Sequence, residues 1–132
     1  MARVTGIGGI FFKCKDPETL RAWYHQHLGM ATDQYGCLFS FQAKDHPNNK
    51  GHLQWSPFKE DTTYFAPSTR EFMINYRVDD LDALVSQLRA AGIAFLDEME
   101  TYPYGKFIHL LDPEGNKLEL WEPVDPGFEP AG

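Results

Sequence analysis

Apolar and polar positions along the chain follow one plan that predicts a strand and then a helix. Residues 9–15 read GIFFKCK, a short apolar run that is typical of a strand. The segment Asp16-Pro17-Glu18 is typical of a helix start. The Asp16 carboxylate can accept hydrogen bonds from the unpaired backbone N–H groups of the first turn, and Pro17 has no N–H group to leave unpaired. The apolar stripe of this helix, expected to face a sheet, is Leu20, Trp23, Tyr24 and Leu28, and Gly29 supplies the stop.

The same plan returns 64 positions later, where Asp80 takes the place of Asp16. Residues 72–78 form the strand, Asp79 and Asp80 cap the helix, and Gly92 ends it. The apolar stripe of the second helix is Leu81, Leu84, Val85 and Leu88. Because strand, cap, stripe and stop recur in the same order at this spacing, the sequence predicts an internal repeat.

Each predicted helix is followed by three strand-like segments. They are residues 31–34, 37–43 and 52–58 in the first half, with a turn at 46–51, and residues 93–96, 106–111 and 117–122 in the second. The prediction is therefore an α+β domain over residues 1–132, made of two βαβββ modules. Module one spans about 4–58 and module two about 70–123, with a linker at about 59–69 and a tail rich in proline and glycine at 124–132.

Composition and charge limit the partners of this domain. The chain has 132 residues, 42% of them apolar, which fits one ordinary globular domain. Its formal net charge of -7 argues against nucleic acid and against an anionic membrane, both of which need a basic surface. The acidity either favours a cationic ligand or serves solubility alone.

Two cysteines, Cys14 and Cys37, show no metal-ligand spacing and no disulfide framework. The apolar stretch at the N-terminus is too short for a membrane span and does not resemble a signal peptide. We therefore expect a cytoplasmic, reduced protein.

Several segments resemble one known superfamily. They are the stretch Lys15-Asp16-Pro17-Glu18 with Trp23-Tyr24 and Leu28-Gly29, and the closing DPEGNKLELWEP of residues 112–123. Together with the repeated plan they resemble the glyoxalase / bleomycin-resistance / extradiol-dioxygenase (vicinal oxygen chelate) superfamily over nearly the whole chain. The resemblance implies that the two modules form a half-barrel around a central cleft, and that the protein is a homodimer. It does not name a reaction.

The resemblance also implies four metal-ligand positions on inward-facing strands. They fall on Gly9, Gln54, Met73 and Glu119, of which only Glu119 matches the superfamily pattern. Glycine has no side chain, and the thioether of methionine is a soft ligand that does not suit magnesium, nickel or zinc. We therefore expect a degenerate metal site and no tightly bound cofactor.

A shifted ligand set is the alternative. The segment Asp112-Pro113-Glu114-Gly115 predicts a three-residue hairpin loop, and counting outward from it places His109 opposite Glu119. By strand alternation His52 shares a face with Gln54, so these four residues could converge on a divalent metal. The simpler interpretation is that His109 and Glu119 form a hydrogen-bonded pair and that His52 lies near solvent. Such a pair could also act as a catalytic acid–base couple.

Alternation predicts the remaining lining of an apolar, aromatic cleft. Its expected residues are Phe11, Lys13, His52, Gln54, Met73, Asn75, Arg77, Lys117 and Trp121. Four loop aromatics either cover the cleft or only pack beneath their loops: Tyr64, Phe65, Tyr102 and Tyr104.

Three functions remain open from the sequence. The first is binding of a small molecule in the cleft, as in bleomycin-resistance proteins, with a degenerate metal site. The second is a metal-dependent lyase, isomerase or dioxygenase that uses His109 and Glu119. The third is a dimerisation module without catalytic activity.

Overall fold

The computed structural model describes residues 2–42 and 50–124; most of the predicted turn at 46–51, with His46, and nearly all of the tail lie outside this range. The helices are α1 (Pro17–Leu28) and α2 (Leu81–Ala90). The strands are β1 (Val4–Cys14), β2 (Thr32–Asp33), β3 (Gly36–Gln42), β4 (Lys50–Lys59), β5 (Phe72–Val78), β6 (Glu100–Tyr102), β7 (Gly105–Leu111) and β8 (Lys117–Pro123).

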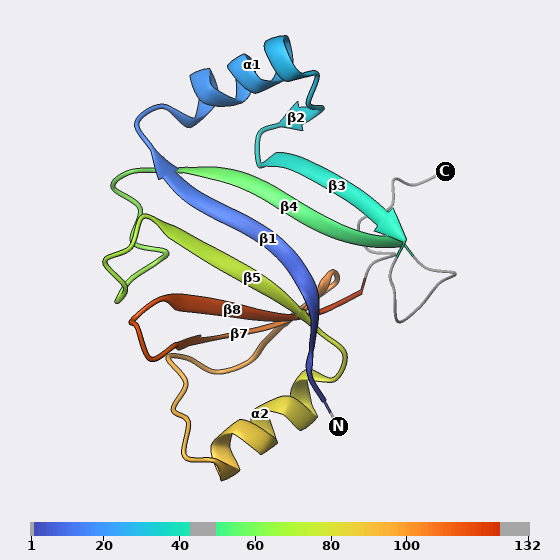
Figure 1. The fold of residues 1–132 in the computed structure, drawn as a ribbon, viewed down its shortest axis with the longest axis vertical. Coiled ribbons are helices and arrows are strands. Elements are labelled where there is room, and N and C mark those ends of the chain that lie inside the picture. The colour runs from blue at the N-terminus through green and yellow to red at the C-terminus, as the bar shows by residue number, and fades with distance from the viewer. Residues whose placement is uncertain (1, 43–49, 125–132) are drawn as a thin grey trace.

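All eight strands form one mixed sheet in the order β2-β3-β4-β1-β5-β8-β7-β6. Within each module the first strand pairs in parallel with the last, β1 with β4 and β5 with β8. The modules meet edge to edge, because β1 and β5 pair antiparallel in the middle of the sheet (Figure 1). The predicted α+β fold of two βαβββ modules is confirmed, as an open sheet and not a closed barrel.

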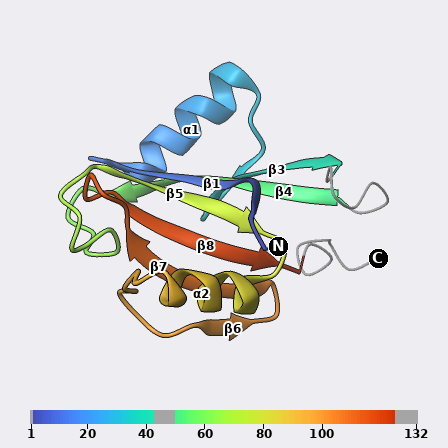
Figure 2. The ribbon, with the colours of Figure 1, turned by 60° about the horizontal axis from the view of Figure 1, so that its bottom comes forward.

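The sheet has an outer face, which carries both helices, and an inner face opposite to it. The outer face is defined by the paired row Trp55, Ile10, Ile74, Leu118 and Leu110. The inner face is defined by the paired row Gln54, Gly9, Asn75, Glu119 and His109. The helices lie towards the two ends of the molecule, with β1 and β5 between them (Figures 1 and 2).

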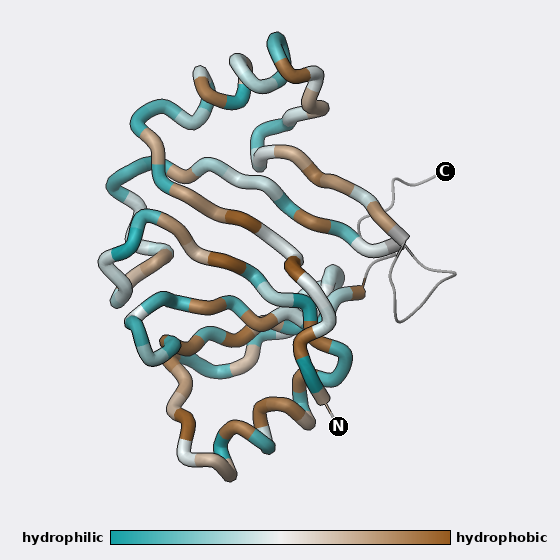
Figure 3. Tube along the Cα trace, viewed as in Figure 1, coloured by the Kyte–Doolittle hydropathy of each residue, from teal (hydrophilic) through white to brown (hydrophobic). Residues whose placement is uncertain are grey.

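Helix α2 seals the outer face of module two. Asp80 caps the helix by accepting from the backbone N–H of Ala83 at 3.1 Å. Leu81 and Val85 are buried, and they pack with apolar residues of the strands beneath: Val78, Ile108, Leu110 and Leu120. Figure 3 shows apolar positions along both α2 and these strands. This cluster is the apolar core of the described part of the chain.

Helix α1 is packed differently, although it has an equivalent capping aspartate. Asp16 caps it through the N–H of Thr19, but no residue of α1 is buried. Tyr24 packs on Trp55 of β4 with ring centroids 4.7 Å apart, while Trp23 is 50% exposed and Leu28 is 59% exposed. The expectation that the whole stripe is packed on the sheet is therefore wrong for Trp23 and Leu28.

Two local predictions also need correction. Residues 93–96 are not a strand, because the backbone N–H of Ile93 still bonds to Leu88 at the end of α2. At the end of this segment the backbone N–H of Leu96 donates to the carbonyl of His109 on β7 at 2.9 Å. The strand predicted at residues 9–15 begins earlier, because β1 starts at Val4, and two shifts of register against β5 lie between Val4 and Gly9.

Candidate functional site

The candidate site lies in the middle of the inner face, where β5, β8 and β7 run side by side. Asn75, Glu119 and His109 stand opposite one another on these three strands. The hairpin that sets this register is the predicted one, since Asp112 N–H donates to the carbonyl of Asn116 at 3.0 Å and Gly115 has φ 82°. The pairing of His109 with Glu119 that the sequence predicts is therefore confirmed.

Glu119 is a buried carboxylate held by three donors. It is 3% exposed. Its Oε1 accepts from Asn75 Nδ2 at 2.7 Å, and its Oε2 lies 2.8 Å from His109 Nε2 and accepts from the Tyr64 hydroxyl at 2.5 Å. Hydrogen bonds from several donors fix the orientation of the Glu119 carboxylate.

His109 bridges two carboxylates. Its Nδ1 lies 2.6 Å from Asp97 Oδ2, and Asp97 Oδ1 also accepts from the backbone N–H of His109 at 2.8 Å. Burial alone would lower the pKa of His109, but the hydrogen bonds and charges of Glu119 and Asp97 outweigh it and raise that pKa above its ordinary value. A protonated imidazole can donate to both partners at once. Sequence reasoning missed Asp97, because it lies in a segment without regular structure.

Tyr64 reaches the same site from the predicted linker. Its ring stacks on Phe58 of β4, with centroids 5.8 Å apart and an interplanar angle of 7°. Burial, and then the charge of Glu119, raise the pKa of Tyr64 far above its ordinary value, so the phenol stays protonated and donates. Its neighbour Phe65 is fully buried. The segment between the modules is therefore more than a linker, because it contributes a contact to Glu119.

Aromatic rings and two lysines surround Tyr64. Phe58 contacts Phe11 at 5.6 Å and Phe65 at 5.2 Å between ring centroids. Lys117 Nζ donates to the carbonyl of Tyr64 at 2.6 Å, and burial lowers the pKa of Lys117. Lys13 lies over the ring of Phe65 at 5.8 Å. Both lysines thus contact the segment that carries Tyr64.

Arg77 and Trp121 occupy the other end of the inner face. The Arg77 guanidinium lies between the rings of Phe41 and Trp121, at 5.4 Å from each centroid. Its Nη1 donates to the carbonyl of His52 at 3.1 Å. His52 is 1% exposed, so the interpretation that it lies near solvent is wrong. Trp121 Nε1 donates to the carbonyl of Tyr104 at 2.9 Å.

The residues at the four superfamily metal positions do not fit a metal ion. A Cβ at Gly9 would lie 2.8 Å from the ring of Phe11, which occupies the space that a ligand side chain would need. Gln54 Nε2 donates to the carbonyl of Tyr35 at 3.1 Å, so its amide is engaged at the β3 side of the sheet. Met73 is fully buried and offers only a thioether. Glu119 is the only one of the four with a suitable anionic donor.

The shifted ligand set is brought together only in part. His109 and Glu119 contact each other, whereas Gln54 is directed to Tyr35. Among residues 2–42 and 50–124, no group of three or more His, Cys, Asp or Glu side chains is arranged to hold a metal ion. The structure thus supports the hydrogen-bonded pair better than a metal centre at these positions.

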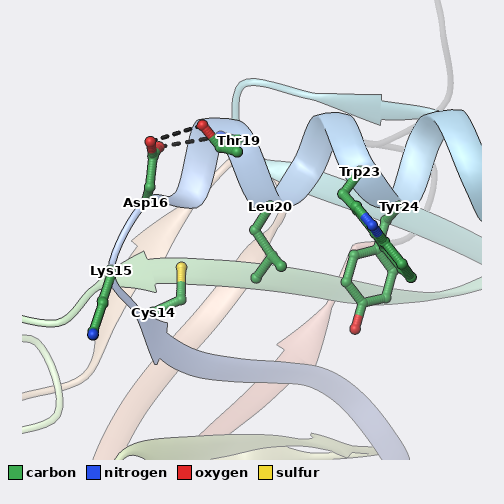
Figure 4. A pocket seen from close by; sticks show the side chains of 7 residues that line it. All are labelled: Cys14, Lys15, Asp16, Thr19, Leu20, Trp23 and Tyr24. Atoms are coloured by element: carbon green, nitrogen blue, oxygen red, sulfur yellow. Dashed lines mark hydrogen bonds between the residues drawn. The ribbon is translucent and has the colours of Figure 1, made fainter.

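Two grooves lie on the outer side, next to α1. The first has a volume of about 500 Å³ and is lined by Cys14, Lys15, Asp16, Thr19, Leu20, Trp23 and Tyr24 (Figure 4). The second, of about 570 Å³, lies between the start of α1 and Lys59. Neither groove contains a residue of the inner-face site.

Neither described helix is long and apolar enough to cross a membrane.

Comparison with known proteins gives one family. The model of the glyoxalase/bleomycin resistance protein/dioxygenase superfamily matches residues 6–120. No curated protein matches the chain in sequence.

Several solved structures share the fold. A methylmalonyl-CoA epimerase variant from Streptomyces coelicolor, in complex with 2-nitronate-propionyl-CoA, has a TM-score of 0.67 at 18% identity over 92% of this chain and 99% of its own. Methylmalonyl-CoA epimerase from Mycobacterium tuberculosis has a TM-score of 0.56 at 21% identity over 92% and 89% of the two chains. The Mn(II)-bound glyoxalase from Novosphingobium aromaticivorans has a TM-score of 0.57 at 22% identity, over 92% of this chain and 40% of its own. At these identities the likeness shows the fold alone.

Proposed function

This chain belongs to the glyoxalase/bleomycin resistance protein/dioxygenase superfamily, and we propose that it binds a small molecule on the inner face, against Glu119, without a protein-held metal. The ligand site comprises Glu119, His109, Asn75 and Tyr64, with Lys117 beside them. The other expected lining residues flank this group on the same face.

One observation carries the proposal. In the described part of the chain, every buried polar or charged side chain lies on the inner face: His52, Ser56, Asn75, Arg77, His109 and Glu119. The outer face of module two, by contrast, buries only apolar side chains. The apolar core cluster under α2 and the buried polar side chains therefore lie on opposite sides of one sheet.

Such an inner face is costly if its only role is stability. Burying ionisable groups requires desolvation, and a well-packed apolar cluster is often as stable as a buried ion pair or more so. Buried ionisable groups with perturbed pKa values are characteristic of functional sites. Apolar and aromatic surroundings with a few directed polar groups are the usual composition of a small-molecule site.

A second candidate function is acid–base catalysis at the same site. The contact of His109 with both Asp97 and Glu119 favours it, because two carboxylates keep the imidazole protonated and oriented. In this role His109 would donate a proton to a bound substrate. A reaction of this kind needs no metal.

We also propose that the protein is a homodimer, as the superfamily resemblance implies. Three apolar side chains of the outer side are open to solvent: Ile10 is 41%, Phe72 41% and Trp23 50% exposed. A second copy that covers them would remove apolar surface from water.

A screen of small molecules tests the binding function. We expect at least one compound in a panel of cations, anions and neutral compounds to raise the melting temperature of the protein saturably. The effect should disappear in Glu119→Gln and persist in Glu100→Gln, a matched change at an exposed carboxylate of β6. Addition of EDTA should not change the affinity of the protein for the compound. Mass spectrometry of the compound after incubation with the protein would reveal whether it is converted to a product.

The binding proposal has clear contrary outcomes. It is wrong if the whole panel gives no saturable shift, or if the shift survives in Glu119→Gln. Loss of binding in EDTA would show that a metal takes part.

A further inference from the structure

Both carboxylate oxygens of Asp97 are bound to the same residue, His109. Oδ1 accepts from the backbone N–H of His109 at 2.8 Å, and Oδ2 lies 2.6 Å from His109 Nδ1. In return, the carbonyl of His109 accepts from the backbone N–H of Leu96 at 2.9 Å. Two adjacent residues of the segment between α2 and β6 are therefore tied to one residue of β7, through its backbone as well as its side chain.

Apolar side chains on either side of Asp97 hold this segment in place. Phe95 and Met99 are partly buried against the apolar core cluster under α2. The Arg89 guanidinium of α2 lies 5.5 Å from the centre of the Phe95 ring. Asp97 therefore cannot turn away from His109 Nδ1 without giving up its bond to the backbone of β7 or shifting an anchored segment.

Glu119, at the other nitrogen of the imidazole, has donors besides His109. Asn75 donates to its Oε1 and the Tyr64 hydroxyl donates to its Oε2. The same hydroxyl lies 3.5 Å from His109 Nε2 and can turn to donate to it. If Nε2 loses its proton, Glu119 thus keeps two donors, whereas an unprotonated Nδ1 would set a lone pair against the Asp97 carboxylate.

We propose that Asp97 is a positioning residue that fixes the Nδ1 proton of His109, so that Nε2 is the nitrogen that exchanges a proton with a ligand. This inference rests on the proposed acid–base function and gives the two nitrogens of one imidazole different roles. When His109 acts as the acid, the Nε2–H bond breaks and its electron pair stays on Nε2. The proton then bonds to a lone pair of the ligand, while the Nδ1–H bond to Asp97 remains.

Nitrogen-15 NMR of the His109 imidazole tests the proposal, because protonated and unprotonated ring nitrogens have well-separated chemical shifts. The pH of the wild-type protein is raised until His109 is neutral, and His109→Gln identifies its signals. We expect Nδ1 to keep its proton and Nε2 to lose it. The Nδ1–H tautomer should be favoured by about tenfold, which corresponds to one hydrogen bond to a charged group.

Asp97→Asn should remove this preference. The amide has a single oxygen, so it cannot accept from both the backbone N–H and the Nδ1–H of His109, and the Nε2–H tautomer should become at least equally populated. Glu98→Gln is the matched control, because Glu98 is the adjacent carboxylate and is exposed. It should leave the tautomer unchanged. His25, whose Nδ1 lies 2.8 Å from the carbonyl of Met30, is an internal reference that neither variant should alter.

Three outcomes overturn the inference. The first is a neutral wild-type His109 that carries its proton on Nε2 in half of the molecules or more. The second is a preference for Nδ1–H that survives in Asp97→Asn, and the third is an equal loss of that preference in Glu98→Gln. The wild-type measurement decides even if Asp97→Asn does not fold. No ligand is needed, so failure here is distinct from failure of the proposed function, which the compound panel decides.

Discussion

Gly8 allows three side chains to meet over the middle of β1. A Cβ at this position would lie 2.7 Å from Trp121 Cε3 and 2.9 Å from Arg77 Cγ, and it would also clash with Asn75 Oδ1. At Gly6, two residues earlier on the same strand, a Cβ would have no neighbour within 4 Å. The inner face is therefore packed directly on the backbone of β1 at one glycine and not at the other.

The Gly8→Ala substitution tests this packing. We expect it to lower the free energy of unfolding by about 1–3 kcal/mol, because the added methyl group must displace large side chains. Gly6→Ala should change that free energy by only about 0.5 kcal/mol or less, since the methyl group enters open space. Urea denaturation of both variants measures the difference, and equal effects would show that the clash at position 8 is relieved easily.

Residues of the site differ in how far the sequence could locate them. Glu119 and His109 lie on one hairpin, so counting from its turn is enough to pair them. Asp97 and Tyr64 lie in segments without regular structure, whose paths depend on contacts with distant strands. The same is true of Gln54, because its bond to Tyr35 depends on how the turn before β3 folds back.

The two helices have the same start signal and share two positions of the apolar stripe, yet only α2 is part of the apolar core cluster. Leu81 and Val85 lie at buried positions of α2, whereas the positions 64 residues earlier hold Pro17 and Arg21. Proline and arginine cannot fill those places on the sheet as leucine and valine do. This difference explains why α1 packs mainly through Tyr24.

The caps of the two helices should therefore affect stability differently. Asp80→Ala removes the cap of a helix that belongs to the core, and we expect the free energy of unfolding to fall by about 1 kcal/mol. Asp16→Ala removes the equivalent cap of α1, which we expect to fray without a comparable change in global stability. Hydrogen exchange of each helix and urea denaturation measure the two effects. A similar global loss in both variants would mean that α1 is as firmly packed as α2.

At the scale of the molecule, none of the described helices covers the middle of the outer face. Helices α1 and α2 lie towards opposite ends, so β1 and β5 between them expose Ile10 and Phe72 (Figure 1). A stable protein–protein interface buries about 800 Å² on each partner, more than scattered surface residues provide. The exposed apolar residues Ile10 of β1, Phe72 of β5 and Trp23 of α1, together called the apolar strip, are the surface that the proposed dimer would bury.

Sedimentation velocity tests the proposed dimer. We expect the wild-type protein to sediment as a dimer at micromolar concentration and Ile10→Lys to sediment as a monomer, because a buried lysine at the centre of the interface is unfavourable. Leu96→Lys is the control, since Leu96 is equally exposed, at 41%, but lies outside this strip. A monomeric wild type, or the same shift in both variants, would contradict the proposal.

The sequence by itself determined the two βαβββ modules, the faces of the strands and the pairing of His109 with Glu119. These features depend on local patterns, namely the repeat in register, the alternation along each strand and one tight turn. Only the tertiary structure decided that Tyr64 and Asp97 reach the site, that α1 stands largely outside the core, and that Phe11 occupies the space above Gly9. Those outcomes depend on contacts between residues far apart in the chain, which periodicity and spacing do not encode.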